Sequence, residues 1–284
     1  MKRATVFTHR RADDVHGALR DLLETAARVG WTLCFSPEET AKLGLSPREG
    51  IELDAPVARD ADLALVLGGD GTILYALREY AGTGVPIFAV NFGEVGFLAT
   101  VEPDDVADGL RRAFAGDFEV LALPGIEAQV GGGDWLAMND VSFHRQQGLR
   151  VADLAFDVAE DEVGRVRCDG LVIATPAGST GYNLANGGPV MAWGVEGLAV
   201  SFIAPHSLTA RALVVAPQDA IHVRNRSREE PVDVSADGRP ICELAPGRGL
   251  SARFHDGLGT LAQTHGASFY HRLREKFGRL ANGV

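Results

Sequence analysis

The stretch LVLGGDGTILYAL (residues 65–77) joins a strand-like run to a helix-like run through a turn rich in glycine. Glycines at such a turn let an anion approach the backbone amides, and the N-terminus of the following helix attracts phosphate. The turn therefore predicts a phosphate-binding site. The residues expected to form it are Gly68, Gly69, Gly71 and Thr72.

An aspartate, Asp70, lies in the middle of this turn and indicates a second kind of chemistry. A carboxylate beside phosphates raises repulsion unless it binds a metal ion or takes a proton from an attacking hydroxyl. The turn lacks the third glycine of G-x-G-x-x-G, and no Gly-Lys pair completes a Walker A loop anywhere in the chain. We expect Asp70 to be catalytic; the simpler alternative is that it caps the helix.

The stretch CDGLVIATPAGSTGYNLANGGPV (residues 168–190) is the second one that carries chemistry. A strand-like run leads into a segment of small, hydroxyl and amide residues with one aromatic residue, Tyr182. Hydroxyls and glycine amides offer hydrogen bonds to a polar ligand, and a tyrosine ring is suited to stacking on a base or ribose. We expect a ligand-binding loop here, with a flexible hairpin as the alternative.

A hydrolase is a competing interpretation of the same stretch. Residues 177–181, AGSTG, resemble a nucleophile elbow, and Asp237 followed by His255 or His265 keeps the chain order of an α/β-hydrolase triad. The elbow requires a helix directly after its serine, whereas a loop rich in Gly, Asn and Pro follows here. The sequence therefore disfavours the hydrolase.

Strand-like and helix-like runs alternate over residues 1–120. The strand-like runs lie at 4–9, 31–35, 63–67 and 85–91, and the helix-like runs lie at 15–26, 72–81 and 103–114. Strands separated by helix-length segments imply right-handed βαβ units and a largely parallel sheet. We therefore predict an α/β, Rossmann-like domain over 1–120, with the GGDGT turn at the carboxyl edge of its sheet, where such folds bind ligands.

Short strand-like runs at close spacing, separated by Gly, Pro, Asp and Asn, fill residues 121–266. This texture predicts an all-β, sandwich-like domain. Residues 268–280 return to a helical pattern that places Phe269, Leu273, Phe277 and Leu280 on one face. Because an isolated helix needs a surface to pack against, we expect residues 267–284 to fold back on the first domain.

Composition excludes several classes of partner. The formal net charge of −11 supplies no basic face for a nucleic acid or an anionic membrane, although an anionic small ligand needs only local positive potential. No apolar run approaches the roughly 18 to 20 residues that span a bilayer, and the N-terminus does not read as a signal peptide. The three scattered cysteines agree with a reducing compartment. We expect a cytoplasmic protein.

Six blocks of the sequence together resemble the bacterial NAD kinases (ATP/polyphosphate-NAD kinases), in matching order along most of the chain. The blocks are GGDGT, VNFGEVGFLAT (90–100), MND (138–140), DGLVIATPAGSTGYNLANGGPV (169–190), PHSLTARALVV (205–215) and DGR (237–239). The second and fifth blocks are the more specific ones, because turns like GGDGT also occur in diacylglycerol-type lipid kinases, sphingosine kinases and phosphofructokinases.

The resemblance implies a phosphotransferase with an alcohol group as acceptor. It would transfer the γ-phosphate of ATP to the 2′-hydroxyl of the adenosine ribose of NAD, giving NADP, with Mg²⁺ or another divalent cation. It also implies a homodimer or homotetramer whose partners are the small molecules NAD and ATP. Two alternatives stay open: a lipid kinase that shares the GGDGT turn, and a non-catalytic NAD-binding sensor.

The resemblance also assigns residues. Asp70 matches the family's catalytic aspartate, with Mg²⁺ possible near it, and Asn139 and Asp140 match a pair that holds ribose hydroxyls, since two neighbouring acceptors suit a vicinal diol. The NAD-binding residues implied are Asp70, Gly71, Phe92, Asn139, Asp140, Arg167, Asp169, Thr180, Gly181, Tyr182, Asn183, Ala185 and Ala204.

The chain departs from the family pattern at four positions. Ala177 and Gly181 replace the threonine and alanine of Pro-Thr-Gly-Ser-Thr-Ala-Tyr, which removes one hydroxyl and loosens the backbone. Tyr75 stands where many bacterial members carry a basic residue, and Arg239 stands where a glutamine is usual. These changes concern the phosphate-donor contacts more than the NAD contacts, and they motivate the sensor alternative.

Overall fold

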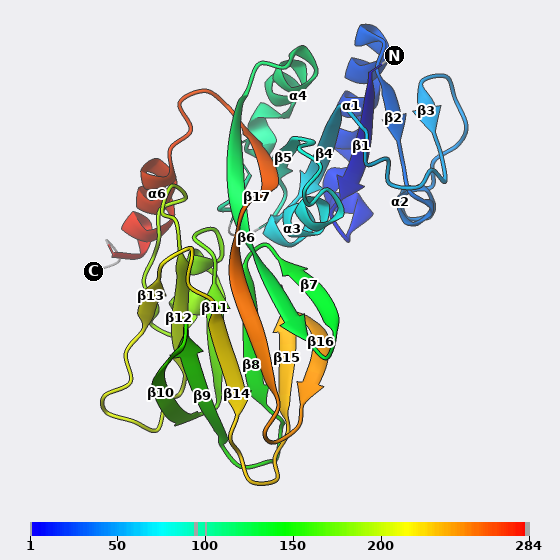
Figure 1. Ribbon diagram of the computed structural model, residues 1–284. Coiled ribbons are helices and arrows are strands. Elements are labelled where there is room, and N and C mark those ends of the chain that lie inside the picture. Colours follow the sequence, from blue (N-terminus) through cyan, green and yellow to red (C-terminus); the bar gives the residue numbers. More distant parts are fainter. Residues whose placement is uncertain (1, 94–95, 100, 282–284) are drawn as a thin grey trace. The chain divides into compact units, whose positions relative to one another are not determined.

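The computed structural model of the chain describes residues 2–93, 96–99 and 101–281, and the contacts of the chain divide it into two compact units (Figure 1). Unit 1 takes in the residues up to Ala122 and those from Gly259 on, and unit 2 is Leu123–Leu258. We predicted borders after residue 120 and after residue 266. The second border differs because one long strand, β17 (Gly249–Gln263), runs from unit 2 into unit 1 without interruption.

Unit 1 is built on a parallel sheet, as predicted. Its strands are hydrogen-bonded in the order β3-β2-β1-β4-β5, and the end of β17 pairs with β5. Every pairing within this set is parallel, which confirms the α/β prediction. The strands are β1 (Arg3–Thr8), β2 (Thr32–Cys34), β3 (Ile51–Glu52), β4 (Leu63–Gly68) and β5 (Ile87–Asn91).

Helices connect these strands and complete the core of unit 1. They are α1 (His16–Val29) after the 3-10 turn η1 (Ala12–Val15), α2 (Pro37–Leu43), α3 (Asp70–Glu79), α4 (Val106–Ala115) after η2 (Pro103–Asp105), and α6 (Phe269–Ala281). Gly30 is the C-cap residue of α1 at φ 70°, a left-handed conformation that glycine adopts without strain. Fully buried side chains from sheet and helices, among them Leu22, Leu65, Phe88 and Leu110, form one core.

Helix α2 and strand β3 are absent from the sequence prediction. Helix α2 has only seven residues, too few to show an apolar period. Its start nevertheless carries a local signal, because Ser36 precedes Pro37 and is followed three residues later by Glu39. The Ser36 hydroxyl accepts a hydrogen bond from the Glu39 amide at 3.3 Å, so half of a capping box is present.

Unit 2 consists of two sheets with a shared apolar core, which confirms the predicted sandwich. One sheet has the order β10-β9-β14-β17, with β6 paired to β17 and β7 to β6; the other has the order β13-β12-β11-β8-β15-β16. Core residues include Phe143, Leu154, Leu171 and Val223. The strands are β6 (Glu119–Val130), β7 (Gly133–Ala137), β8 (Asp140–Arg145), β9 (Ala152–Val158), β10 (Asp161–Cys168), β11 (Gly170–Ala174), β12 (Leu198–Ile203), β13 (Leu213–Val215), β14 (Ile221–Asn225), β15 (Val232–Ala236) and β16 (Arg239–Leu244).

The strands of unit 2 differ in detail from the sequence prediction. The sequence DWLAMNDVSFHR (134–145) predicts one strand, but the structure has two, because the extended backbone bends at Met138-Asn139 between β7 and β8. Strand β16 was not predicted, since its side chains are mostly exposed or half-buried and Pro240 interrupts the strand pattern.

The C-terminal helix α6 packs on unit 1, as predicted. The rings of Phe97 and Phe277 lie 5.6 Å apart between centroids, and Phe269 is buried. The buried guanidinium of Arg272 donates a hydrogen bond to the Phe97 carbonyl. The side chain of Leu280, and Glu94, Val95 and Thr100 of the block 90–100, lie outside the described residues. Within the part of the chain that the structure describes, no helix has the length and apolar character needed to cross a membrane.

Candidate active site

Asp70 begins α3, directly after the turn that follows β4. Gly69 is the N-cap residue and no side chain caps the helix, so the capping alternative for Asp70 is wrong. The carboxylate instead accepts hydrogen bonds from backbone amides of a later loop. The Phe97 amide lies 3.0 Å from Oδ2 and 3.2 Å from Oδ1, and the Leu98 amide lies 3.2 Å from Oδ1.

The turn after β4 and the loop after β5 touch through backbone atoms. A Cβ atom built on Gly69 would lie 3.0 Å from the Gly93 Cα, and one on Gly93 would lie 2.8 Å from the Gly69 Cα. The Phe92 amide also donates to the Gly68 carbonyl at 3.2 Å. Gly69 and Gly93 therefore allow the two backbone segments to lie in direct contact, which a side chain at either position would prevent. Gly71 has no atom within 4 Å of such a Cβ, so its side of the turn is open.

Two opposing effects act on the pKa of the Asp70 carboxyl. Burial raises the pKa of the carboxyl, while the amides of Phe97 and Leu98 and the positive charges of Arg272 and Lys276 lower it by smaller amounts. The net shift is upward. A carboxylate with a raised pKa is a stronger proton acceptor than a solvated aspartate. The predicted catalytic acid and the predicted phosphate turn thus lie together in unit 1.

In unit 2, Asn139 and Asp140 are held by the carboxylate of Asp237. It accepts the amide hydrogens of Met138 at 2.9 Å, Asn139 at 2.7 Å and Asp140 at 3.1 Å. The Asp237 amide donates in return to the Asp140 carbonyl at 2.9 Å. Asp237 has a positive φ of 47°, a conformation that an aspartate tolerates better than most residues. The hydrolase interpretation assigned this acid to a triad, but its oxygens fix the backbone of Asn139 and Asp140.

The side chains of Asn139 and Asp140 present acceptors. Asn139 Oδ1 is buried and has no hydrogen-bond partner among the described residues. Asp140 is buried as well, and burial together with the negative charge of Asp237 raises its pKa to about 7. Asn139 Oδ1 therefore has an unused capacity to accept a hydrogen bond, and the Asp140 carboxyl is a more basic acceptor than a solvated aspartate.

Asp140 predicts a pH dependence of stability. Its pKa is 3.8 ordinarily and about 7 in the folded chain, so folding binds protons between these values. The neutral Asp140 carboxyl contributes fully to the free energy of unfolding below about pH 4. This contribution falls between about pH 4 and pH 7 and is lost above pH 7. Asp140→Asn removes this loss, so the melting temperature of the variant relative to the wild type should rise from pH 4 to 8. A difference in melting temperature that does not change over this range contradicts the prediction.

The segment after β11 is a pair of helical turns, η3 (Gly178–Thr180) and α5 (Tyr182–Ala185), so neither the expected loop nor a flexible hairpin describes it. Ser179 is fully buried; its hydroxyl donates to the Pro176 carbonyl at 2.7 Å and accepts the Met191 amide at 2.9 Å. Strand β11 is antiparallel to both of its neighbours. A buried, engaged serine on an antiparallel sheet is no nucleophile elbow, so the hydrolase interpretation is wrong.

These helical turns pack directly on Asn139. A Cβ atom on Gly178 would lie 2.1 Å from the Asn139 carbonyl oxygen, which also accepts the Thr175 amide at 2.8 Å. Thr175 Oγ1 donates to the Met138 carbonyl at 2.8 Å and accepts the Gly178 amide at 3.0 Å. Asn139 and Gly178, 39 residues apart in the chain (178 − 139), therefore belong to one structural element.

Tyr182 and Asn183 differ in their accessibility. The Tyr182 ring is 37% exposed and stacks on His144, with centroids 5.6 Å apart and planes at 15°. Asn183 is fully buried and donates to the carbonyls of Ser179 at 3.0 Å and Pro189 at 2.9 Å, so its contacts hold the segment. Thr180 is half-buried, and Gly181 and Ala185 are exposed.

His144 is not among the residues predicted from the sequence. It lies four residues after Asp140 on β8, which places both side chains on one face of that strand. Burial lowers the pKa of His144, which favours a neutral ring beneath Tyr182. Its spacing from Asp140 was the signal that could have identified it.

Arg167, Asp169 and Ala204 lie at the other end of β11 from Asp140. Asp169 forms an ion pair with Arg145 at 2.5 Å, and its amide donates to the Ile203 carbonyl. Arg167 is exposed at the end of β10, and Ala204 is exposed after β12 with a φ of 43°. Arg145, which the sequence pattern does not single out, therefore holds the Asp169 carboxylate.

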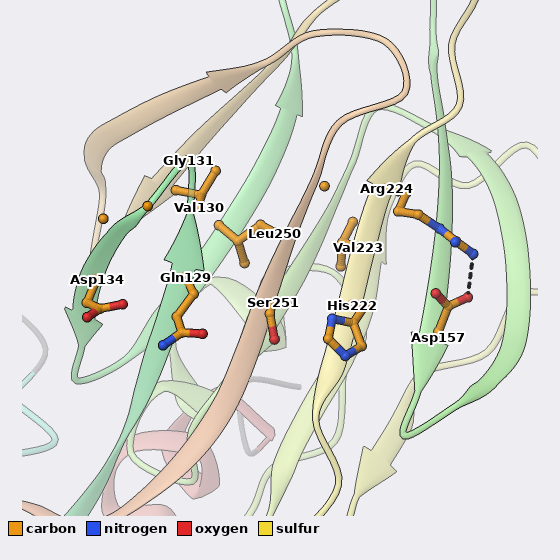
Figure 2. A pocket seen from close by; sticks show the side chains of 13 residues that line it. Gln129, Val130, Gly131, Asp134, Asp157, His222, Val223, Arg224, Leu250 and Ser251 are labelled. Carbon is orange, nitrogen blue, oxygen red and sulfur yellow. Dashed lines mark hydrogen bonds and ion pairs between the residues drawn. The ribbon is translucent and has the colours of Figure 1, made fainter.

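A pocket of about 640 Å³ lies on the sheet of unit 2 that contains β6, β14 and β17, and not on the sheet that contains β8 and β11 (Figure 2). Gln129, His222 and Ser251 line it from β6, β14 and β17, and an ion pair of 2.9 Å joins Arg224 to Asp157 at its edge. None of the predicted site residues lines this pocket.

Family models match both units of the chain. The model of the ATP-NAD kinase N-terminal domain matches residues 32–118, and that of the ATP-NAD kinase C-terminal domain matches residues 138–253. An NAD kinase of Gemmatimonas aurantiaca is 33% identical over 284 residues, which cover 97% of this chain and 96% of that protein.

Solved structures agree with the fold. A yeast NADH kinase complexed with NADH aligns with a TM-score of 0.85 at 21% identity, covering 100% of this chain and 89% of that chain. An NAD kinase from Archaeoglobus fulgidus in complex with ATP aligns with a TM-score of 0.75 at 25% identity, covering 98% of both chains.

Proposed function

The chain belongs to the NAD kinase family, and we propose from that premise that Asp70 is the residue on which its reaction depends. The reaction transfers the γ-phosphate of ATP to the 2′-hydroxyl of the adenosine ribose of NAD and gives NADP. The observation that carries this proposal is the buried carboxylate of Asp70, set in a glycine turn and held by the amides of Phe97 and Leu98.

The geometry suggests how unit 1 contributes. Asp70 accepts the proton of the ribose 2′-hydroxyl as the oxygen attacks the γ-phosphorus in line with the leaving ADP. Because two amides already orient the carboxylate, little reorganisation is needed when the hydroxyl arrives. Gly68, Gly69, Gly71 and Thr72 offer backbone amides and the start of α3 to the phosphate oxygens.

Unit 2 supplies the contacts to the nucleoside. Asn139 Oδ1 and the Asp140 carboxyl accept hydrogen bonds from ribose hydroxyls, and the exposed Tyr182 ring stacks on a base or ribose. Asp237 and Gly178 keep this pair in place, as described above. The other residues proposed to bind NAD are Gly71, Phe92, Arg167, Asp169, Thr180, Gly181, Asn183, Ala185 and Ala204.

A magnesium ion fits this account only if the substrate supplies most of its ligands. Among the described residues, no group of three or more His, Cys, Asp or Glu side chains is placed to hold a metal ion. Mg²⁺ commonly binds one or two carboxylates together with substrate phosphates, and Asp70 would be the protein carboxylate only in the alternative in which it holds the ion and does not take the hydroxyl proton. When bound, the ion would neutralise charge that develops on the phosphate oxygens.

We propose that the partners are NAD, ATP and further copies of the same chain, in a homodimer or homotetramer. The oligomer follows from the family and not from a contact in the structure. Light scattering on the purified protein tests it: a mass of two or four chains is expected, and a monomer contradicts it.

The direct test of the function is to incubate the purified protein with NAD, ATP and Mg²⁺. An NADP-specific dehydrogenase then measures the product, and formation of NADP is expected. NAD binding without NADP favours the sensor, and phosphorylation of diacylglycerol without NAD affinity favours the lipid kinase. Parallel reactions with polyphosphate in place of ATP, and with NADH in place of NAD, define the donor and the acceptor.

A further inference from the structure

The peptide group between Phe97 and Leu98 lies between two charged side chains. Its N–H, from Leu98, donates to Asp70 Oδ1 at 3.2 Å. Its carbonyl, from Phe97, accepts a hydrogen bond from Nη1 of Arg272 on α6. A cation, one peptide group and the carboxylate are therefore connected in series within unit 1.

This arrangement strengthens the hydrogen bond from the Leu98 amide to the Asp70 carboxylate. A hydrogen bond to a charged donor is stronger than one between neutral groups, and a peptide polarised at its oxygen is a better donor at its nitrogen. Arg272 is only 7% exposed, and its pKa, although lowered by burial to about 10, keeps it charged at neutral pH. The charge is thus present and shielded from water.

We propose that Arg272 positions the catalytic carboxylate of Asp70 through the Phe97–Leu98 peptide. The inference rests on the proposed role of Asp70 and extends it to the C-terminal helix. Arg272 touches neither the attacking hydroxyl nor the phosphate in this account. Its effect is to fix the loop whose two amides set the direction of the Asp70 oxygens.

Other charged groups surround this series without contacting the peptide in any described hydrogen bond. Lys276 adds positive charge toward Asp70, and Glu102 and Glu275 act on Arg272. Glu102 is itself engaged by Asn91 Nδ2 at 3.2 Å. Lys276 therefore serves as a test of charge alone, because its loss changes the potential and leaves the Arg272 hydrogen bond in place.

The central experiment compares Arg272→Gln with the wild type in kcat and in the dissociation constant for NAD. Loss of a charge-assisted hydrogen bond that orients the base should lower kcat by about 10-fold or more. The dissociation constant should change by less than about threefold, because the proposed nucleoside contacts lie in unit 2. If Arg272 only stabilised the fold, the substitution would lower the fraction of protein molecules that are active and would leave the kcat of each active molecule unchanged. Titration of the NAD-binding sites measures that fraction independently of kcat.

Chemical rescue of Arg272→Ala by a small cation tests the role of the Arg272 guanidinium independently of Arg272→Gln. A pocket of about 240 Å³, lined by Gly96, Glu102 and Lys276 among others, adjoins Arg272 and gives a small cation access when the side chain is truncated. Added guanidinium should raise the kcat of Arg272→Ala several-fold, and ammonium at the same ionic strength should not. Equal responses to the two salts contradict the proposal.

Controls separate this inference from the function on which it rests. Arg274→Gln removes an exposed arginine of the same helix and should leave kcat unchanged, and Lys276→Gln should lower kcat less than Arg272→Gln does. Wild-type kcat in Arg272→Gln, with Asp70→Asn inactive, overturns the proposal alone. Full activity of Asp70→Asn overturns the proposed function as well.

Circular dichroism shows whether each variant is folded. If Arg272→Gln does not fold, Arg272→Met is measured instead, because methionine fills much of the same buried space and offers no hydrogen-bond donor and no charge. A reduced kcat with unchanged NAD binding supports the proposal there, and a wild-type kcat contradicts it.

Discussion

Asp70→Asn is expected to lower the turnover of NADP formation by about 10²-fold or more while NAD still binds. Asparagine has nearly the shape of aspartate but accepts no proton at neutral pH. Its amide nitrogen would also face a backbone amide donor of Phe97 or Leu98, where the carboxylate offers two acceptor oxygens. The prediction is checked by steady-state kcat together with calorimetric titration of NAD.

The control for this variant is Asp13→Asn in the same unit. The Asp13 side chain is 97% exposed, so the same chemical change there should leave turnover and NAD binding unchanged. Turnover at the wild-type level in Asp70→Asn would remove Asp70 from the mechanism. Loss of NAD binding equal to the loss of turnover would assign it to binding instead of catalysis.

Gly178→Ala is expected to have the largest effect in unit 2. The new Cβ would lie 2.1 Å from the Asn139 carbonyl oxygen, which is backbone and cannot swing away. Moving it also weakens the hydrogen bond from the Thr175 amide. Overpacking of this kind costs about 1 to 3 kcal/mol, and the displaced Asn139 should weaken NAD binding by about 10-fold or more.

Urea unfolding and calorimetric titration of NAD measure the two effects. Gly194→Ala is the matched control, because Gly194 is exposed in the same unit and a Cβ there meets no atom within 4 Å. The control should keep wild-type stability and affinity. Wild-type NAD affinity in a folded Gly178→Ala protein would show that the position of Asn139 does not matter for binding.

The sequence predicts Asp70 and its turn, but not what holds the carboxylate. The spacing of apolar residues, the glycines and the aspartate among them are local signals. They place the turn at the carboxyl end of β4. The amides of Phe97 and Leu98 are 27 and 28 residues away in the chain. They reach Asp70 because β4 and β5 are neighbours in the sheet, and no local pattern indicates which loop residue will meet the acid.

The same reason explains Asp237 and Arg272. The sequence shows Asp237 as one acid among several in a β region, yet it binds the amides of Met138 to Asp140, almost 100 residues earlier. Arg272 reads as one charge on an amphipathic helix, and its partner lies 175 residues away. The helix itself and its return to the first domain were predictable, because an apolar face must be covered.

The position on NAD that receives the phosphate distinguishes the NAD kinase reaction from its alternatives most directly. A proton–phosphorus correlation NMR spectrum of a reaction with NAD, ATP and Mg²⁺ reports this directly, with a parallel Asp70→Asn sample. The expected result is a new phosphomonoester signal that correlates with the 2′ proton of the adenosine ribose, growing about 10²-fold more slowly or worse in the variant. A monoester attached elsewhere, or equal growth in the two samples, would contradict the account.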